Sequence, residues 1–383
     1  MRFEFATATR IVFGEGASAD LPELARTFGT HPLVITGASP GRVSALVSAI
    51  SAETFSVPAE PTVDLVRDGA RRARQAGCDV VIAIGGGSAI DAGKAIAALA
   101  TNGGEPLDFL EVVGKGSAIS VPPLPLIAVP TTAGTGSEVT RNAVLGSPEH
   151  GIKASLRSPL MLPKVALVDP ELTWSLPPAV TASTGLDALT QLIEPYVSTR
   201  ANPLTDAICA EGIPYAARAL RRACRDGSDR EARRDMALAS LFGGLALANA
   251  GLGVVHGFAS PLGGSWKAPH GALCAALLPH GMFANVTAMR ARAPQHSALE
   301  RYTVIARLLT GRPDATADDG VDWVGALCAD LNVPPLRAWG ITEADLPGVV
   351  EEAARASSMK ANALQLTTPE LLAAVKAALC PDV

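Results

Sequence analysis

Four short runs of apolar and β-branched residues most constrain what this chain can fold into. They read PLVITG (32–37), CDVVIAIGGGS (78–88), LPLIAVP (124–130) and KVALVDP (164–170), and a weaker run, ETFSVP, covers 53–58. Continuous apolar runs of this kind are typical of strands that are covered on both faces, as in a parallel sheet. A helical pattern at 63–77 lies between two of the runs. The first part of the chain is therefore predicted to be α/β, with a doubly wound, mostly parallel sheet.

The pattern changes after Pro170. From SLPPAVTASTGLDALTQLIEPYVS to AAVKAALC the apolar spacing is helical, and proline and glycine residues separate the segments. At 383 residues the chain exceeds the size at which one hydrophobic core usually stops growing. We expect two domains that meet near residues 172–178: an α/β domain at 1–175 and an all-α domain at 176–383.

Composition excludes several classes of protein. The net charge of −5 gives no electrostatic reason to expect nucleic acid or an anionic membrane as a partner. The six cysteines are scattered without a CxxC pair, and the N-terminus shows no secretory signal, so we expect reduced thiols in a cytoplasmic protein. The stretch from Met236 to Trp266 carries no charge and is long enough to cross a bilayer, but its glycines, His256 and Pro261 favour a buried helix.

The run AIGGGSAIDAGKAIAALA (83–100) places three glycines and a serine between a predicted strand and a predicted helix. Gly85, Gly86 and Gly87 have no Cβ to block a phosphate, and the helix directs unpaired N–H groups and the positive end of its dipole at the same point. This order of elements favours an anion-binding loop over a turn without a ligand, although the spacing is not G-x-G-x-x-G.

A second polar loop, VPTTAGTGSEVTRNAV (129–144), follows the next predicted strand. Thr131, Thr132, Thr135 and Ser137 offer hydroxyl groups at the carboxyl end of that strand, where open α/β sheets bind ligands. Two such loops on successive strands indicate a dinucleotide crevice.

The order of GGGSAIDAGK, PTTAGTGSE, DPEL, GLDAL and two downstream histidines resembles the iron-containing (group III) alcohol dehydrogenase family over nearly the whole chain. The resemblance implies a dinucleotide-binding domain, a helical metal and substrate domain, and an active site in the cleft between them. It implies metal positions at Asp187, Gln191, His256 and His270, and the two histidines are also the catalytic candidates. The candidate cofactor contacts are Gly85, Gly86, Gly87, Ser88, Asp91, Thr131, Thr132, Thr135, Ser137 and Ser39.

Two positions depart from the family pattern. Gln191 stands where the metal-binding helix usually carries a histidine, one turn after Asp187, and Ser260 stands in the last place of an HGxxH pattern. An amide oxygen is uncharged and is a poorer ligand for iron or zinc than imidazole. We therefore expect that a divalent metal, iron or zinc, binds weakly or is absent, with Asp187, His256 and His270 as the three better donors.

Taken without the family, the residues support a metal site less strongly. A histidine in the apolar GVVHGFA can equally be hydrogen-bonded inside a core. Asp187 lies among leucines in a predicted helix, and a buried carboxylate needs a partner or a cation. A metal, a histidinium or a lysine would each supply one.

The loops and the resemblance predict an NAD(P)-dependent oxidoreductase that interconverts a small alcohol and its aldehyde or ketone by hydride transfer. The protein can accelerate this reaction by positioning both reactants and by stabilising negative charge on the oxygen. A Lewis-acidic metal would do so, and without one a protonated His256 or His270 must donate to the oxygen.

Other classes stay open from sequence. Maleylacetate reductases, a metal-independent branch of the superfamily, reduce an oxo-acid, which needs cationic anchors such as Lys153, Arg157 or Lys267. Dehydroquinate synthase-like lyases use bound NAD without net redox change, and an NAD-binding protein without catalysis is the non-enzyme alternative. The turn after strand 32–37 carries no acidic residue and Arg42 follows it, so we expect NADP(H) to be accepted. We also expect a homodimer or a larger homo-oligomer.

Overall fold

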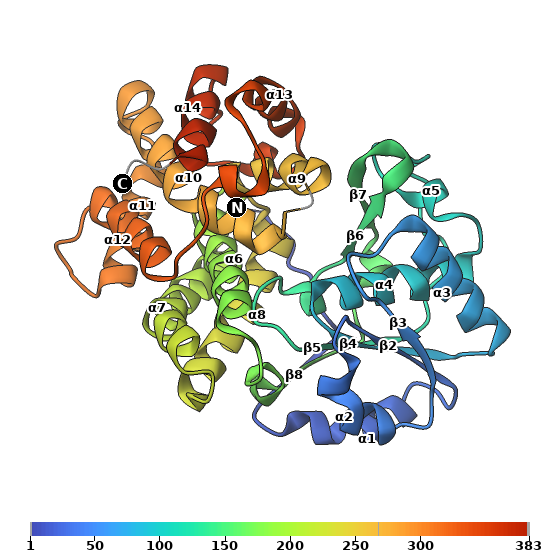
Figure 1. Ribbon diagram of the computed structural model, residues 1–383. Helices are drawn as coiled ribbons and strands as arrows, with labels where there is room; N and C mark the ends of the chain where they lie inside the picture. The colour runs from blue at the N-terminus through green and yellow to red at the C-terminus, as the bar shows by residue number, and fades with distance from the viewer. Residues whose placement is uncertain (1, 267, 381–383) are drawn as a thin grey trace. The chain divides into compact units, whose positions relative to one another are not determined.

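A computed structural model of the chain describes residues 2–266 and 268–380 (Figure 1). The chain divides into two compact units: an α/β unit, Ala6–Leu176, and a helical unit, Pro177–Val383 with Met1–Phe5. A sheet of parallel strands lies in the first unit, and the second is built from helices. The fold class predicted from the sequence is therefore confirmed.

The α/β unit is built on a six-stranded sheet in which the paired strands are all parallel. The order across the sheet is β1-β8-β5-β4-β2-β3. Strands β2, β4, β5 and β8 are buried along their whole length, as their continuous apolar runs predict. The strands are β1 Arg10–Phe13, β2 Pro32–Thr36, β3 Glu53–Ser56, β4 Val80–Gly85, β5 Leu126–Pro130 and β8 Val165–Val168.

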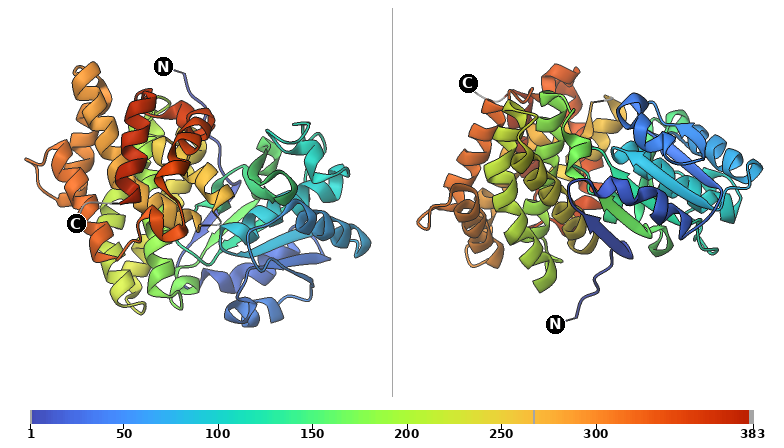
Figure 2. Two further views of the ribbon diagram at one scale, coloured as in Figure 1. Left: turned by 45° about the horizontal axis from the view of Figure 1, so that its top comes forward. Right: turned by 90° about the horizontal axis from the view of Figure 1, so that it is seen from below.

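Each face of the sheet has its own apolar core, because successive residues of a strand point to opposite faces. Leu33 and Val81 join the core that α3 and α4 cover, whereas Val34 and Ile82 join the core that α1 and α2 cover. Helices therefore cover both faces, as the views in Figure 1 and Figure 2 show. The helices of this unit are α1 Leu21–Arg26, α2 Ser44–Ser48, α3 Val63–Gln75, α4 Gly87–Asn102 and α5 Pro106–Phe109.

The strand order reverses between β2 and β4. The chain runs from β2 outward to β3 and then returns to place β4, β5 and β8 on the other side of β2. Thr36 pairs with Ile84 and Gly85 pairs with Pro130, so the carboxyl ends of β2, β4 and β5 lie along one edge. A reversal of this kind leaves the crevice in which open α/β sheets bind ligands.

A hairpin of two antiparallel strands, β6 (Asn142–Ser147) and β7 (Ile152–Arg157), was not predicted from the sequence. The polar loop predicted at 129–144 ends earlier than expected, because β6 already begins at Asn142. Alternate residues of both strands are buried, so the hairpin has one covered face. Such short alternating patterns are harder to recognise than continuous apolar runs.

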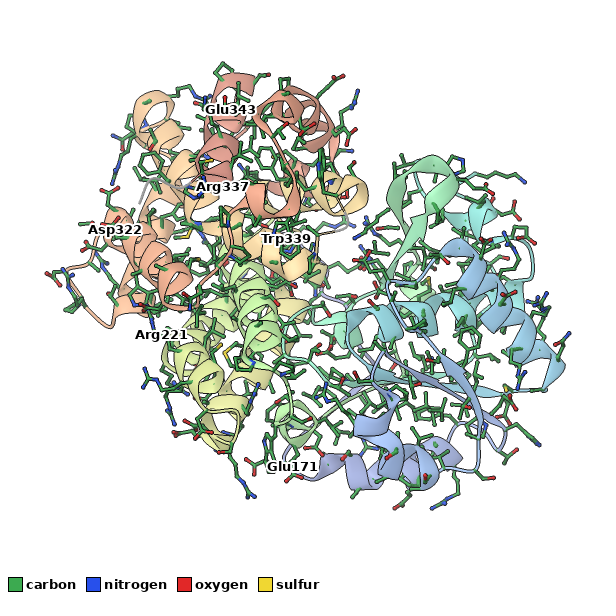
Figure 3. All side chains as sticks on the ribbon, in the orientation of Figure 1. Glu171, Arg221, Asp322, Arg337, Trp339 and Glu343 are labelled. Atoms are coloured by element: carbon green, nitrogen blue, oxygen red, sulfur yellow. The ribbon has the colours of Figure 1, made fainter. Side chains whose placement is uncertain are left out.

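The helical unit begins with α6, directly after the last segment of the α/β unit. Side-chain caps define several helix starts; Asn202, for example, accepts hydrogen bonds from the N–H groups of Leu204 and Thr205. Arg221 on α7, which is labelled in Figure 3, donates to Asp330 at the end of α12. The helices are α6 Pro178–Val197, α7 Pro203–Arg225, α8 Arg230–Ala250, α9 Val254–Ser265, α10 His270–Arg292, α11 Ser297–Thr310, α12 Ala317–Asp330, α13 Leu346–Arg355 and α14 Thr368–Leu379.

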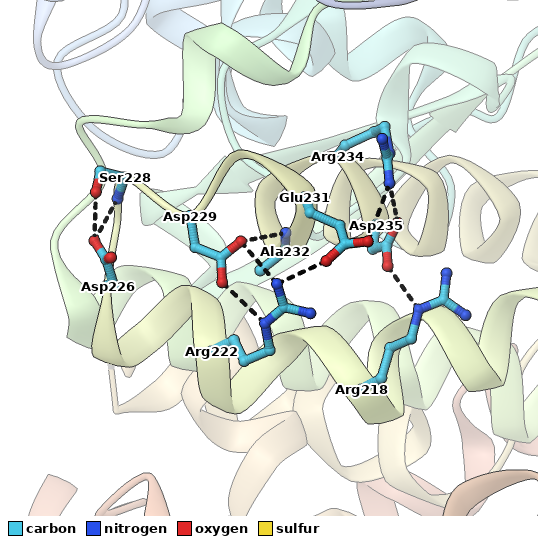
Figure 4. Close-up of polar contacts among 9 residues, drawn as sticks. All are labelled: Arg218, Arg222, Asp226, Ser228, Asp229, Glu231, Ala232, Arg234 and Asp235. Carbon is cyan, nitrogen blue, oxygen red and sulfur yellow. Dashed lines mark hydrogen bonds and ion pairs between the residues drawn. The ribbon is translucent and has the colours of Figure 1, made fainter.

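The turn between α7 and α8 is held by charged side chains (Figure 4). Asp229 caps α8 by accepting from the N–H of Ala232, and it also accepts two hydrogen bonds from Arg222. One turn further along α8, the buried Asp235 accepts from Arg218. A charged partner for a buried carboxylate reduces the cost of its desolvation, and these contacts fix α7 against α8.

The charge-free stretch from Met236 to Trp266 covers most of α8 and all of α9, and the two helices are bent by 98° at the break between them. Within the described residues, α10 is the single unbroken helix long and apolar enough to cross a membrane. Of its most apolar 18-residue segment, 72% is buried inside the protein. Burial of that extent is typical of a core helix.

Candidate functional site

The glycine loop predicted to bind phosphate lies at the reversal point of the sheet. Gly85 ends β4, Gly86 occupies the N-cap position of α4, and no side chain caps this helix. Gly86, Gly87 and Ser88 are partly exposed. The uncapped N–H groups and the positive end of the helix dipole therefore face an accessible edge, as an anion site requires.

The two polar loops touch each other. A Cβ added at Gly87 would lie 2.9 Å from side-chain atoms of Thr135, and one added at Gly86 would lie 3.4 Å from Thr132. A Cβ at Gly85 would come within 2.6 Å of the Ala89 methyl group. Gly85 and Gly87 are thus required by packing whether or not a ligand binds, whereas a small side chain at Gly86 meets only ordinary contacts.

A buried lysine on α4, Lys94, forms hydrogen bonds with the second polar loop, residues 129–144. The Lys94 ammonium donates to Ser137 Oγ at 2.7 Å and to Thr140 Oγ1 at 2.9 Å, and it lies 3.3 Å from Asp91 Oδ1. Asp91 in turn accepts from Ser137 Oγ at 2.5 Å and from the N–H of Val144. Burial lowers the pKa of Lys94, and its contact with Asp91 offsets part of that shift. These contacts make Asp91 and Ser137 positioning residues for the loop.

The remaining predicted cofactor residues divide by exposure. Thr131 is buried, whereas Thr132 and Thr135 are partly exposed beside the glycine loop. Ser39 is exposed and follows β2, at the same edge of the sheet. Arg42 donates to Ser175 Oγ and to the carbonyl oxygen of Leu172, so its guanidinium is held against the last segment of the α/β unit.

In the helical unit, three helices bring the predicted metal residues together. Asp187 comes from α6, His256 from α9 and His270 from the first turn of α10. Asp187 Oδ1 lies 3.4 Å from His256 Nε2 and 3.7 Å from His270 Nε2. Asp187 is 1% exposed, whereas the His270 side chain is 40% exposed, so the cluster reaches the surface at His270.

Glu194, two turns after Asp187 on α6, orients His256. Its Oε2 accepts from His256 Nδ1 at 2.7 Å, and its Oε1 accepts from the N–H of Val255 at 2.7 Å. A carboxylate can only accept here, so Nδ1 carries a proton and Nε2 is the ring nitrogen that faces Asp187. A second carboxylate that fixes the tautomer in this way is typical of histidines that bind metals.

Cys274, one turn after His270 on α10, also lies in the cluster. Its Sγ is 3.6 Å from His270 Nε2 and 3.8 Å from His256 Nε2. One donor atom from each of Asp187, His256, His270 and Cys274 lies within 4.8 Å of the other three. The cysteine is buried and is not in a disulfide.

The electrostatics of the cluster favour positive charge. Cys274 is the largest influence on His270 and, with Asp187, raises the pKa of that imidazole to about 9. Burial lowers the pKa of His256, but Cys274, Asp187 and Glu194 together raise it well above its usual value. Burial raises the pKa of Asp187, and the two histidines more than compensate. A divalent cation would supply the positive charge that protons otherwise provide, and its binding would release them.

Gln191 occupies the remaining predicted metal position, and its amide nitrogen faces Asp187. The side chain is buried and donates to the Asp187 carboxylate. Its Oε1 lies on the side of α8, 3.6 Å from where a Cβ on Gly243 would be, and it accepts no hydrogen bond from the described residues. Ser260, the second departure from the family pattern, is exposed on α9 one turn after His256.

Comparison with known proteins decides the family. Residues 8–170 match the iron-containing alcohol dehydrogenase family, and residues 181–379 match the C-terminal domain of the Fe-containing alcohol dehydrogenase family. The chain belongs to the iron-containing alcohol dehydrogenase family. The predicted enzyme class is thereby confirmed: this alcohol dehydrogenase family member is an oxidoreductase that interconverts alcohols and carbonyl compounds with a nicotinamide cofactor.

Individual relatives cover almost the whole chain. Alcohol dehydrogenase 4 of Schizosaccharomyces pombe is 38% identical over 379 residues, which span 96% of this chain and 87% of that protein. The structure of a 1,3-propanediol oxidoreductase superposes with a TM-score of 0.89 at 34% identity, covering 99% of this chain and 100% of that one. A sulfoacetaldehyde reductase from Bifidobacterium kashiwanohense, solved in complex with NAD+, superposes with a TM-score of 0.87 at 30% identity, over 100% of both chains.

Sequence reasoning missed Cys274, which belongs to the cluster with Asp187, His256 and His270, and Glu194, which orients His256. Both left a signal in the helical periodicity. Glu194 follows Asp187 by two turns of the same helix, and Cys274 follows His270 by one turn. Each therefore lies on the same helix face as a metal-site residue that the sequence predicted. The candidate anchors for an oxo-acid are less well supported: Lys153 pairs with Glu60, Arg157 lies near Glu111, and Lys267 is outside the described residues.

Proposed function

We propose that this chain oxidises a small alcohol, or reduces the matching aldehyde or ketone, with NAD(P) held at Gly86–Ser88 and a divalent cation held by Asp187, His256 and His270. The observation that carries the proposal is the convergence of these three side chains from three helices into one buried cluster. Asp187 Oδ1 is buried and accepts no hydrogen bond from the described residues, which is the state expected of an atom reserved for a cation.

The chemistry divides between the cofactor, the cation and the chain. A bound nicotinamide carries the hydride, and a bound cation supplies Lewis acidity toward the substrate oxygen. The chain contributes fixed geometry. Glu194 holds the His256 ring in one tautomer, and the Asp187 carboxylate offsets the positive charge of the cluster. Because His270 is partly exposed, the substrate would approach from that side of the cluster.

The α/β unit supports the cofactor part of the proposal. The exposed N–H groups at the start of α4 suit a pyrophosphate, and Thr132 and Thr135 lie beside them. Ser39 lies at the same edge, where an acidic residue would otherwise hold the ribose hydroxyl groups and repel a 2′-phosphate. We therefore propose that both NAD(H) and NADP(H) are accepted. Arg42 would have to leave Ser175 and Leu172 to reach a 2′-phosphate.

The alternative enzyme classes gain no support. The anchors that a maleylacetate reductase would need are paired with carboxylates or lie outside the described residues. The relatives with the same fold are named as dehydrogenases, an oxidoreductase and reductases, so a lyase is not favoured. A homodimer or larger assembly remains a prediction, which mass measurement of the purified protein in solution would check.

The test is an activity screen with metal and cofactor controlled. Purified protein, treated with chelator and then supplied with Zn²⁺ or Fe²⁺, is incubated with NAD+ or NADP+ and a series of small alcohols that includes 1,3-propanediol. We expect formation of the reduced nicotinamide in the reloaded protein and its loss in Asp187→Ala. Absence of turnover in both directions with every cofactor and metal combination would refute the proposed function.

The cofactor site has its own test at Gly86. A Gly86→Val side chain would occupy the place proposed for phosphate, so nicotinamide cofactor binding should fall below detection in a fluorescence titration. Gly86→Ala meets Thr132 only at 3.4 Å and should fold, which makes it the milder control. Unchanged cofactor affinity in folded Gly86→Val would contradict the assignment of this loop.

A further inference from the structure

Cys274 is the residue of the cation cluster that the sequence pattern left without a role. It sits on α10 one turn after His270, so both side chains project from the same face of that helix. Its Sγ is close to the Nε2 atoms of both histidines, at 3.6 Å and 3.8 Å. Packing alone does not explain a thiol between two imidazoles and a carboxylate, because each of these neighbours is polar.

Four of the six separations between the donor atoms are close to those of ligands around one tetrahedral ion, and all six are within 4.8 Å. Zinc binds oxygen and nitrogen at about 2.0 to 2.2 Å and sulfur at about 2.3 Å, so neighbouring donors in a tetrahedral site are about 3.3 to 3.6 Å apart. The oxygen–nitrogen separations here are 3.4 Å and 3.7 Å, and the sulfur–nitrogen separations are 3.6 Å and 3.8 Å. These four separations differ from the tetrahedral values by a few tenths of an ångström at most.

Hydrogen bonds among Asp187, His256, His270 and Cys274 explain the separations of their donor atoms less well than a shared ion does. Asp187 Oδ1 accepts no hydrogen bond from the described residues, and its separations from the two Nε2 atoms exceed those of good hydrogen bonds. A thiol has one proton and can donate to only one of the two histidines. His256 already uses Nδ1 for Glu194, which leaves Nε2 as the ring nitrogen that faces the sulfur and the carboxylate.

We propose that Cys274 is a direct metal ligand, so that the site is built from Asp187, His256, His270 and Cys274. This inference rests on the proposed cation at the first three residues and adds a fourth donor, so the substrate oxygen would enter as a fifth ligand, a coordination number that catalytic zinc sites can reach. A thiolate is a soft ligand, and a set of one oxygen, two nitrogens and one sulfur favours Zn²⁺ and disfavours Mg²⁺. The weak binding expected from sequence counted only three good donors, and a fourth makes the site tighter.

Gln191 is outside this ligand set. Its amide donates to Asp187, and its Oε1 is turned toward Gly243 on α8. The amide therefore supports a ligand rather than serving as one. The donor missing at position 191 is supplied from α10 instead, by Cys274.

Cobalt substitution tests the proposal through a signal that activity does not provide. Chelated protein is titrated with Co²⁺, and the visible d–d bands report binding while a thiolate-to-cobalt charge-transfer band in the near ultraviolet reports sulfur ligation. We expect both signals in wild type. In Cys274→Ser the charge-transfer band should disappear, and Co²⁺ affinity should fall by at least about 100-fold, since even residues that only support a ligand cost 10- to 100-fold.

Two matched variants separate ligation from general disturbance. Cys328→Ser changes another buried thiol, whose Sγ donates to the Ala275 carbonyl on α10, and it should retain the band and the affinity. Gln191→Ala should retain the charge-transfer band, and its Co²⁺ affinity should fall by about 10- to 100-fold, as expected for a residue that only supports a ligand. If Cys274→Ser fails to fold, X-ray absorption of the wild-type zinc protein decides, because a sulfur ligand appears at about 2.3 Å.

The outcomes distinguish this inference from the proposed function. Visible bands without a charge-transfer band in wild type, or no sulfur in the zinc shell, would overturn Cys274 as a ligand while leaving the cation site intact. Protein that takes up no Co²⁺ or Zn²⁺ would overturn both. Equal Co²⁺ affinity in wild type and folded Cys274→Ser would also refute the inference.

Discussion

Replacing Glu194 with glutamine should weaken metal binding although Glu194 itself is not a ligand. The variant keeps the size and shape of the side chain. Its amide oxygen can still accept from the N–H of Val255, but the NH₂ group then faces His256 Nδ1, which can no longer donate. The ring must adopt the opposite tautomer, with the proton on Nε2, where the cation would bind.

The expected magnitude follows from this geometry. Loss of a group that orients a metal-binding histidine typically costs 10- to 100-fold in metal affinity, or about 1.4 to 2.7 kcal/mol. In the metal-free protein, the free energy of unfolding should also fall by about 1.5 to 3 kcal/mol, because a charge-assisted hydrogen bond in a buried site is lost. Both effects have the same cause.

The assay is a competition titration of Zn²⁺ against a chromogenic chelator, combined with urea denaturation of the metal-free protein. Glu211→Gln, which removes an exposed carboxylate from α7, is the control for the loss of one negative charge. Zinc affinity in Glu194→Gln within twofold of the control would show that the carboxylate does not set the tautomer. A loss confined to zinc affinity, with unchanged stability, would show that the hydrogen bond contributes little without metal.

Three further predictions concern the surrounding structure. Lys94→Met removes the ammonium that donates to Ser137 and Thr140, so the free energy of unfolding should fall by about 3 kcal/mol in urea denaturation. A fall of less than about 1 kcal/mol would show that Lys94 does not stabilise the second polar loop. Burial raises the pKa of Glu138 from 4.5 to about 7, so the folded state resists ionisation. Stability should then fall by about 3 kcal/mol as the pH rises from 4.5 to 7 and stay lower above it, and Glu138→Gln should remove this component. At Gly271, an added Cβ would lie 2.5 Å from the Ser183 carbonyl oxygen, so Gly271→Ala should displace α10 from α6 and reduce zinc affinity at least tenfold, whereas Gly325→Ala, with open space around it, should bind zinc normally.

The sequence predicted the α/β sheet because strands buried on both faces have a signature that does not depend on their partners. PLVITG and LPLIAVP are apolar at successive positions, and each became a buried strand. The β6–β7 hairpin has one covered face and short strands, and its first residues follow directly on a polar loop, so its pattern was too weak to separate from that loop. Which face of the hairpin is covered depends on tertiary packing, which the local sequence does not encode.

The cation cluster shows the same division between local and tertiary information. Asp187 and His256 were found through sequence motifs, but their separation of 3.4 Å depends on how α10 packs against both α6 and α9. The relation of Cys274 to His270 is local and could have been predicted from their helical spacing. Its relation to His256, on another helix, could not, and that second contact is what gives the thiol its place in the cluster.

All the proposed donors to the cation come from α6, α9 and α10, whereas both nucleotide loops belong to the α/β unit. A ligand stabilises the part of a protein that binds it by RT ln(1 + [L]/Kd), about 4 kcal/mol at a thousandfold excess over Kd. Zinc should therefore slow amide hydrogen exchange in the helices that hold it, and a nicotinamide cofactor should slow exchange around β4 and α4. Exchange rates would then report the occupancy of metal and cofactor separately, in a single sample and without any turnover.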